Sequence, residues 1–114
     1  YSDENDEHFA DFQAMENQLK ALRTLEDKPY RLLRLPFPEA IYDNGVRLPA
    51  TYANFVILNH SVLCPRYAQP YRDGQAMSQL QKAFPGRKII SIDARTVIRQ
   101  HGSLHCLTMQ FPKI

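Results

Sequence analysis

The stretch "TYANFVILNHSVLCP", residues 51–65, is the part of the chain that decides the fold. Residues 52–58 are rich in aromatic and β-branched side chains, which favour strands. Asn59 and His60 then supply two turn residues, and residues 61–64 return as a second apolar run. This order predicts a β-hairpin. We expect Pro65 to end it, because proline has no N–H to donate to a neighbouring strand.

The segments after the hairpin predict a helix and a further strand. In "DGQAMSQLQKAFPG", residues 73–86, apolar residues recur at helical spacing, with Asp73 as the candidate N-cap and Pro85-Gly86 as the stop signal. "RKIISID", residues 87–93, has the composition of a short buried strand. A helix between strands indicates the α/β class, with the helix laid on a small sheet.

The end of the chain predicts a short turn and a last strand. "ARTVIRQHG", residues 94–102, is typical of a single helical turn that ends in a bend at Gly102. "SLHCLTMQF", residues 103–111, alternates like a strand. In a regular strand, neighbouring side chains point to opposite faces, so His105 is not the obvious base for Cys106 despite its adjacency, and His60 and His101 stay open.

The part before the hairpin predicts a helix over residues 4–24 that begins in an acidic, exposed stretch, residues 1–11. Its apolar stripe is expected in the core and consists of Phe9, Phe12, Met15, Leu19 and Leu22. Residues 30–36, "YRLLRLP", predict a strand, and Asn44-Gly45 predicts a tight turn with positive φ. No linker divides residues 1–114, so no internal domain boundary is expected.

Composition sets wide limits on function. The chain has 114 residues, 44% hydrophobic, with a formal net charge of +2, which gives no strong attraction to nucleic acid or to a membrane. No apolar run approaches the ~20 residues that span a bilayer. The two cysteines make no disulfide framework and fit a reducing cytoplasm. The chain begins at Tyr1, and its last apolar pattern continues almost to Ile114, so we expect it to be a piece of a longer protein.

Most site types are disfavoured by spacing. None of the candidate metal ligands falls in a C-x-x-C pair or an uninterrupted helical H-x-x-x-H pair; they are His60, His101, His105, Cys64 and Cys106. The four glycines form no phosphate-binding series, the aromatics do not alternate with a basic stripe, and "GSLHC" lacks the G-x-S-x-G motif. Cys106 remains, and on spacing alone it is either a nucleophile or a small buried hydrophobe.

Three segments together resemble a known family: "RLPATYANFVILNHSVLCPRY", "LQKAFPGRKIISIDARTVI" and "QHGSLHCLTMQ", with "DENDEHF" a weaker fourth. They are similar to the "SYVNFYI"-like strand, the "FPGR" turn and the "GGGNIHCIT" ending of the agmatine deiminase and porphyromonas-type peptidylarginine deiminase family. The resemblance covers residues 32–112. The nucleophilic cysteine of that family falls on Cys106.

The resemblance implies a five-module α/β propeller, the pentein fold. This chain would be its C-terminal portion, about one module with pieces of its neighbours. The other modules of the parent chain would be its partners, and they would hold the catalytic histidine and the carboxylates that grip the substrate. No residue here matches those motifs. An isolated piece should then be inactive. Assembly of the parent protein into a homo-oligomer is left open as a possibility.

The implied reaction is hydrolysis of a guanidino group through a covalent Cys106 intermediate, with no metal or organic cofactor. The substrate would be agmatine, giving N-carbamoylputrescine and ammonia for putrescine and polyamine metabolism, or a peptidyl or free arginine. A thiolate suits this reaction because the resonance-stabilised guanidinium carbon is a poor electrophile. The rival functions are an amidinotransferase on the same fold and a non-catalytic interaction module with a buried Cys106.

The residues around Cys106 are given supporting roles. Gly102 either permits a close backbone approach or a positive φ, or is an ordinary turn glycine. We expect His105 to have a packing or hydrogen-bonding role. Residues 100–103 depart from the glycine run of many agmatine deiminases, which leaves the substrate open. Arg47 and Asn54 are expected to be structural.

Overall fold

The computed structural model describes residues 4–112. The chain divides into two compact units, Tyr1–Arg34 and Leu35–Ile114, and each is described here by itself. Within the described residues, neither helix combines the length and the apolar character that crossing a membrane requires.

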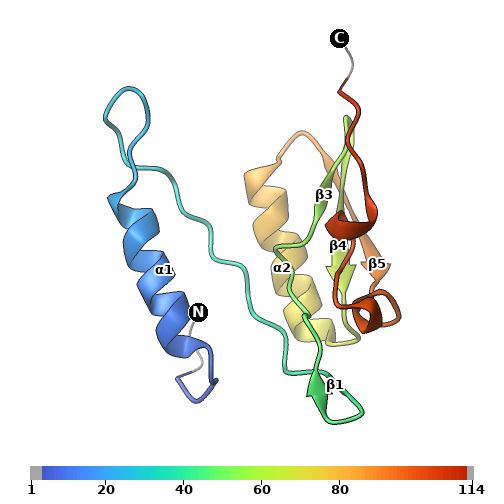
Figure 1. Ribbon diagram of the computed structural model, residues 1–114. Helices are drawn as coiled ribbons and strands as arrows, with labels where there is room; N and C mark the ends of the chain where they lie inside the picture. The colour runs from blue at the N-terminus through green and yellow to red at the C-terminus, as the bar shows by residue number, and fades with distance from the viewer. Residues whose placement is uncertain (1–3, 113–114) are drawn as a thin grey trace. The chain divides into compact units, whose positions relative to one another are not determined.

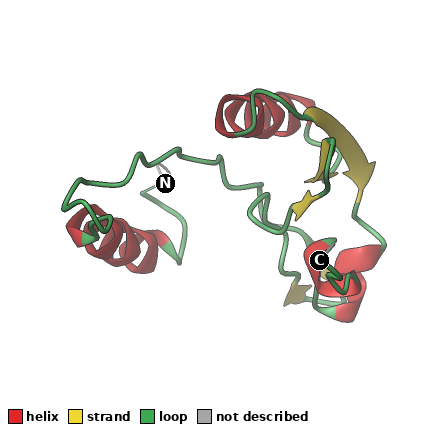
Figure 2. Cartoon of the chain, turned by 90° about the horizontal axis from the view of Figure 1, so that it is seen from above, coloured by secondary structure: helices red, strands yellow, loops and turns green. Residues whose placement is uncertain are grey.

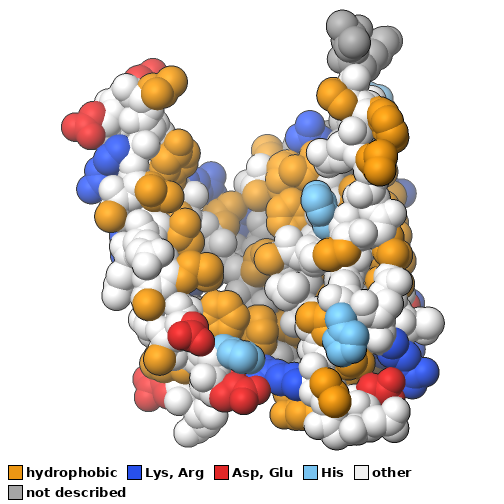
Figure 3. Space-filling model, in the orientation of Figure 1, with side chains coloured by type: hydrophobic (Ala, Val, Ile, Leu, Met, Phe, Trp, Pro, Cys, Tyr) orange, Lys and Arg blue, Asp and Glu red, His pale blue; other side chains and the backbone are white. Residues whose placement is uncertain are grey.

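The first unit contains the helix α1, Phe9–Ala21, which is shorter at both ends than the predicted residues 4–24. None of its residues is buried, and Met15 is 48% exposed. The prediction that the apolar stripe is core is therefore wrong for this chain. A unit of this size has too few residues to bury the apolar face of a helix on its own. Figure 3 shows apolar side chains along the surface of this unit.

The predicted strand over residues 30–36 is absent. The nearest pairing is one isolated bridge between Arg23 and Pro29. Prolines flank this apolar run at positions 29 and 36, and neither can donate to a ladder. Apolar composition alone does not make a strand where no partner strand lies alongside.

The second unit opens with a small hairpin, β1 (Tyr42–Asp43) and β2 (Val46–Arg47), which pair antiparallel. Its two turn residues have positive φ, 48° at Asn44 and 78° at Gly45. This confirms the tight turn predicted from the Asn-Gly pair, because turns of this kind need left-handed backbone at both central positions.

A three-stranded sheet forms the centre of the second unit, in the order β3-β4-β5 (Figure 1). β3 (Val56–Ile57) pairs antiparallel with β4 (Ser61–Arg66), which confirms the predicted hairpin. β5 (Lys88–Asp93) pairs parallel with β4. The first hairpin strand is much shorter than expected, because residues 52 and 53 form a turn and Asn54 lies outside the ladder.

Pro65 does not end β4, contrary to the prediction, and lies inside it opposite Ile92. The ladder explains why. Lys88 and Ala94 donate backbone N–H groups to the carbonyls of His60 and Arg66, both at 3.0 Å, so the even-numbered residues of β4 face β5. The nitrogen of Pro65 faces the other way, where the pairing with β3 has already ended. Its missing N–H therefore costs the sheet no hydrogen bond.

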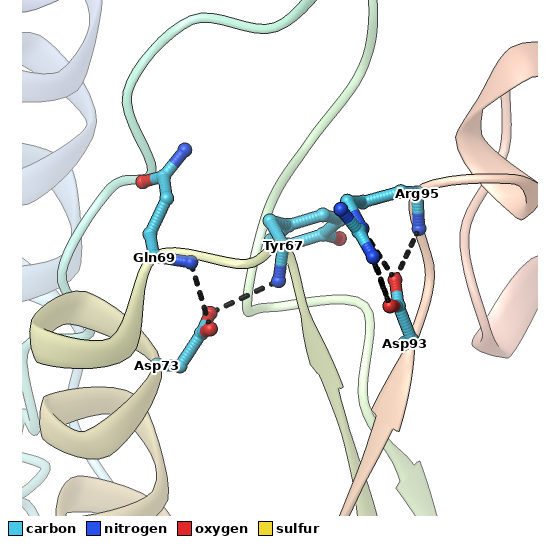
Figure 4. A network of polar contacts seen from close by, with 5 residues as sticks. All are labelled: Tyr67, Gln69, Asp73, Asp93 and Arg95. Carbon is cyan, nitrogen blue, oxygen red and sulfur yellow. Dashed lines mark hydrogen bonds and ion pairs between the residues drawn. The ribbon is translucent and has the colours of Figure 1, made fainter.

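The helix α2, Pro70–Ala83, packs on β4 and β5. It starts three residues before the predicted N-cap, with Pro70 in its first turn, where a missing N–H is harmless. Asp73 is thus not the N-cap. Its buried carboxylate instead accepts the backbone N–H groups of Tyr67 and Gln69, both at 3.0 Å (Figure 4). The Tyr52 hydroxyl donates to the same carboxylate at 2.7 Å.

Two short 3₁₀ helices follow β5, η1 (Val97–Gln100) and η2 (His105–Leu107). Figure 2 shows them on the side of the sheet opposite α2. η1 confirms the predicted helical turn. η2 stands where residues 103–111 were predicted to form a strand, so that prediction is wrong. Leu104 and Ile98 from this region join the core, while Leu107 stays exposed.

Candidate active site around Cys106

Cys106 lies in η2 and its thiol is exposed and unpaired. The other cysteine, Cys64, is only 1% exposed and lies in β4. The alternative in which Cys106 is a buried packing residue is therefore not what the structure shows. An exposed thiol is open to a substrate, whereas Cys64 is enclosed by the core.

Asn54 holds Cys106 from across the fold. Its side-chain Nδ2 donates to the Cys106 sulfur at 3.2 Å. Its Oδ1 accepts the backbone N–H of His105 at 2.7 Å and that of Cys106 at 3.4 Å. One amide thus binds both the sulfur and the backbone of the turn that carries it. This also explains why η2 is no strand, since Asn54 has taken the N–H groups that a ladder would use.

The environment of the thiol favours its ionised form. A backbone hydrogen bond from Ser103 and the Asn54 amide lower the pKa of Cys106. Both groups donate to the sulfur and so stabilise the negative charge of the thiolate. Burial acts in the opposite sense on Cys64 and raises its pKa to about 11. The two cysteines therefore differ in two ways: Cys106 is exposed and has a lowered pKa, whereas Cys64 is buried and has a raised pKa.

Gly102 gives the Cys106 side chain its room. A Cβ added at Gly102 would lie 2.9 Å from the Cβ of Cys106 and 3.4 Å from its sulfur. The positive φ of this bend belongs to His101, at 65°, and not to Gly102. Of the sequence readings for Gly102, close approach is confirmed and positive φ is wrong.

His105 contributes its backbone to the site. Its N–H is bound by Asn54, and its carbonyl accepts the Thr108 hydroxyl at 2.8 Å. The strand-face argument that separated His105 from Cys106 no longer applies, because no strand is present. Across residues 4–112, no histidine side chain makes a hydrogen bond to the thiol. A general base is thus absent from the described contacts of Cys106.

The histidines and cysteines are also candidates for metal binding. Over the part of the chain that the structure describes, no three His, Cys, Asp or Glu side chains gather in a group that could hold an ion. Of the five candidate ligands named from the sequence, Cys106 is hydrogen-bonded to Asn54 and Cys64 is enclosed in the core.

Sequence reasoning missed Asn54. It assigned this residue a structural role, and the structure places its amide on the sulfur. One signal was available: a polar side chain stands inside the apolar run "TYANFVIL". Arg47, the other residue set aside, lies with its guanidinium 5.9 Å from the ring centre of Phe37.

Comparison with known proteins gives relatives over nearly the whole chain. A crystal structure from Porphyromonas gingivalis is 53% identical, with a TM-score of 0.93, and the match covers 97% of this chain and 32% of that one. The agmatine deiminase of C. jejuni is 42% identical, with a TM-score of 0.79, over 91% of this chain and 31% of that one. The agmatine deiminase of Pseudomonas putida is 28% identical over 96% of this chain and 34% of its own length.

The chain therefore spans about a third of the length of these relatives. These close structural matches also support the mixed α/β class predicted from the sequence. The family model described as Porphyromonas-type peptidyl-arginine deiminase matches residues 1–112. On this evidence the chain belongs to the porphyromonas-type peptidyl-arginine deiminase family, to which agmatine deiminases are related.

Proposed function

We propose that Cys106 is the nucleophile of an enzyme that hydrolyses a guanidino group, and that this chain supplies one part of its catalytic domain. The observation that carries the proposal is the exposed thiol of Cys106, bound by the Asn54 amide at 3.2 Å and with a lowered pKa. Family membership and the relatives named agmatine deiminase support a guanidino substrate.

The reaction proceeds in two halves. The Cys106 thiolate forms a bond to the guanidinium carbon, and one C–N bond breaks as that nitrogen takes a proton from a general acid and leaves as ammonia. Water then attacks the same carbon and gives up a proton to the base, and the C–S bond breaks to restore the thiolate. The net change converts a guanidino group and water into a ureido group and ammonia.

The remaining groups come from the rest of the parent protein. The acid and base would be a histidine, and carboxylates would grip the planar guanidinium in pairs of hydrogen bonds. The cationic substrate itself favours the thiolate by Coulomb attraction. We place this chain as the C-terminal portion of a five-module propeller, because it spans about a third of its relatives and has one helix-covered sheet.

The substrate class is a small guanidino compound, agmatine or an arginine. A Cys-to-Ser variant of the C. jejuni agmatine deiminase is described with substrate bound, which supports both the substrate class and the importance of a cysteine. Agmatine would yield N-carbamoylputrescine and ammonia, a step toward putrescine. Both cysteines are unpaired, which fits the reducing cytoplasm in which we place the enzyme.

Replacement of Cys106 in the full-length protein tests the proposal. We expect Cys106→Ser to lower the turnover of agmatine or arginine by roughly a thousandfold or more, since loss of a nucleophile costs at least that much. Cys64→Ala is the matched control, because Cys64 lies far from solvent in β4. Full turnover in the Cys106→Ser protein would end the proposal. Product analysis separates hydrolysis, which gives a ureido compound, from transfer of the amidino group to an amine.

A further inference from the structure

A buried pair of hydroxyl groups lies behind the Cys106 loop. Ser103 and Tyr67 are each 2% exposed, and the Ser103 Oγ lies 3.0 Å from the Tyr67 hydroxyl oxygen. The Tyr67 hydroxyl also donates to the Thr51 carbonyl at 2.9 Å and accepts the Thr51 N–H at 3.1 Å. A tyrosine has a single hydroxyl proton, so Ser103 is the donor in its bond with Tyr67.

This hydroxyl of Tyr67 connects the two segments that hold the thiol. Thr51 stands three residues before Asn54, and Ser103 stands three residues before Cys106. Asn54 donates to the sulfur through its side chain, and Ser103 acts on the sulfur through a backbone hydrogen bond. The Tyr67 hydroxyl oxygen therefore holds both segments. In each segment it binds a residue three positions before the residue at the thiol, Asn54 in one and Cys106 in the other.

Tyr67 is itself anchored at its other end. Its backbone N–H donates to Asp73 at 3.0 Å, as Figure 4 shows, and its ring lies 5.4 Å from that of Tyr52. Asp73 belongs to α2, and Tyr67 follows the last residue of β4. Because the tyrosine is fixed by both helix and sheet, its hydroxyl is a rigid reference point for the two loops.

We propose that Tyr67 and Ser103 are positioning residues, which hold the 51–54 and 103–106 segments at the spacing that keeps the Cys106 thiol reactive. The described side-chain hydrogen bonds of the sulfur are with Asn54, and those of the Tyr67 and Ser103 hydroxyls are with other partners. Tyr67 and Ser103 act through Asn54 and through the Ser103 backbone. The importance of this positioning for catalysis rests on the proposed function. The effect on the reactivity of the Cys106 thiol can be measured without it.

The test measures alkylation of Cys106 by iodoacetamide as a function of pH in the full-length protein, with the labelled peptides resolved by mass spectrometry. Tyr67→Phe removes only the hydroxyl and keeps the ring and the backbone bond to Asp73. We expect the midpoint of the profile to move to higher pH. The rate at pH 7 should fall by about threefold to tenfold, because the displaced segments would weaken the thiolate's stabilisation by about as much as one hydrogen bond contributes.

Tyr52→Phe is the matched control. It also removes a buried hydroxyl, the one that donates to Asp73 at 2.7 Å, but it leaves the contacts among Tyr67, Thr51 and Ser103 in place. It should reduce stability without moving the alkylation midpoint. Ser103→Ala provides the second variant should Tyr67→Phe fail to fold, and it should shift the midpoint in the same direction.

The outcomes separate this inference from the proposed function. An unchanged midpoint in Tyr67→Phe or in Ser103→Ala would overturn the positioning role, as would an equal shift in Tyr52→Phe. Alkylation needs no turnover, so these results stand whether or not Cys106→Ser abolishes hydrolysis. A shift confined to the Tyr67 and Ser103 variants supports the inference.

Discussion

Asn54 is the residue on which the environment of the candidate nucleophile depends most directly. It reaches Cys106 from 52 positions earlier in the chain and binds both the sulfur and the neighbouring backbone. A neutral amide suits this role, because its NH₂ group stabilises a thiolate while its oxygen accepts N–H groups. A carboxylate of the same shape would offer only acceptors and would repel the thiolate.

Substitution of Asn54 should therefore raise the pKa of Cys106. In Asn54→Ala the thiolate loses a donor, and we expect the pH midpoint of alkylation to rise and the rate at pH 7 to fall roughly threefold or more. In Asn54→Asp the added negative charge should raise the midpoint further. Asn59→Ala, at the exposed tip of the β3–β4 hairpin, is the control. Equal profiles for Asn54→Ala and the native protein would contradict this account.

Substitution of Gly102 gives a second prediction at the scale of single residues. Gly102→Ala places a Cβ 2.9 Å from that of Cys106, so the cysteine must shift. We expect a loss of turnover in the full-length protein by on the order of tenfold or more, because nucleophile placement is sensitive to small displacements. Gly86→Ala has nothing within 4 Å of its new Cβ and should keep full activity. Similar activities in the two alanine variants would show that close packing at Gly102 does not matter.

At the scale of elements, η2 and α2 both begin where a side chain accepts backbone N–H groups, a remote side chain at η2 and one of the helix's own at α2. Asn54 binds the first N–H of η2, and the Asp73 carboxylate binds the N–H groups that precede and open α2. At η2 the contact comes from a segment far away in the sequence, whereas Asp73 lies in α2 itself and binds N–H groups six and four residues earlier. This is why both elements start at positions that periodicity did not predict.

Asp73 should carry much of the stability of this region. Asp73→Asn puts an NH₂ group opposite one of the N–H donors, so we expect a loss of about 1–3 kcal/mol in the free energy of unfolding. Asp93→Asn is the control, because Asp93 pairs with Arg95 at the surface, 2.7 Å between Oδ2 and a guanidinium nitrogen (Figure 4). Such pairs contribute only about 0–1 kcal/mol. The urea midpoints of the full-length variants measure both effects.

At the scale of the whole molecule, the chain carries an exposed thiol with a lowered pKa and no described general base. No histidine side chain within residues 4–112 bonds Cys106, and α1 buries none of its residues. Exposed apolar side chains also follow Cys106, namely Leu107, Met109 and Phe111. We expect the groups that cover these side chains and complete the site to lie in the remaining two thirds of the relatives' length.

The 114-residue piece by itself should therefore not turn over substrate. We expect no release of ammonia from agmatine or arginine by the piece, and release by the full-length protein assayed alongside it. Ammonia production by the piece alone would show that its own residues complete the site. In that event His101 and His105, which both precede Cys106 in the sequence, become the candidates for the missing base.

The sequence by itself determined the α/β class, the β3–β4 hairpin, the Asn44-Gly45 turn, β5 and the helical turn η1, because each depends on local composition and turn chemistry. Its motifs also identified the family. Tertiary structure alone decided that Asn54 binds Cys106, that residues 105–107 form a turn, and that Pro65 lies within a strand. These outcomes depend on hydrogen bonds between segments far apart in the chain, and no local pattern contains them.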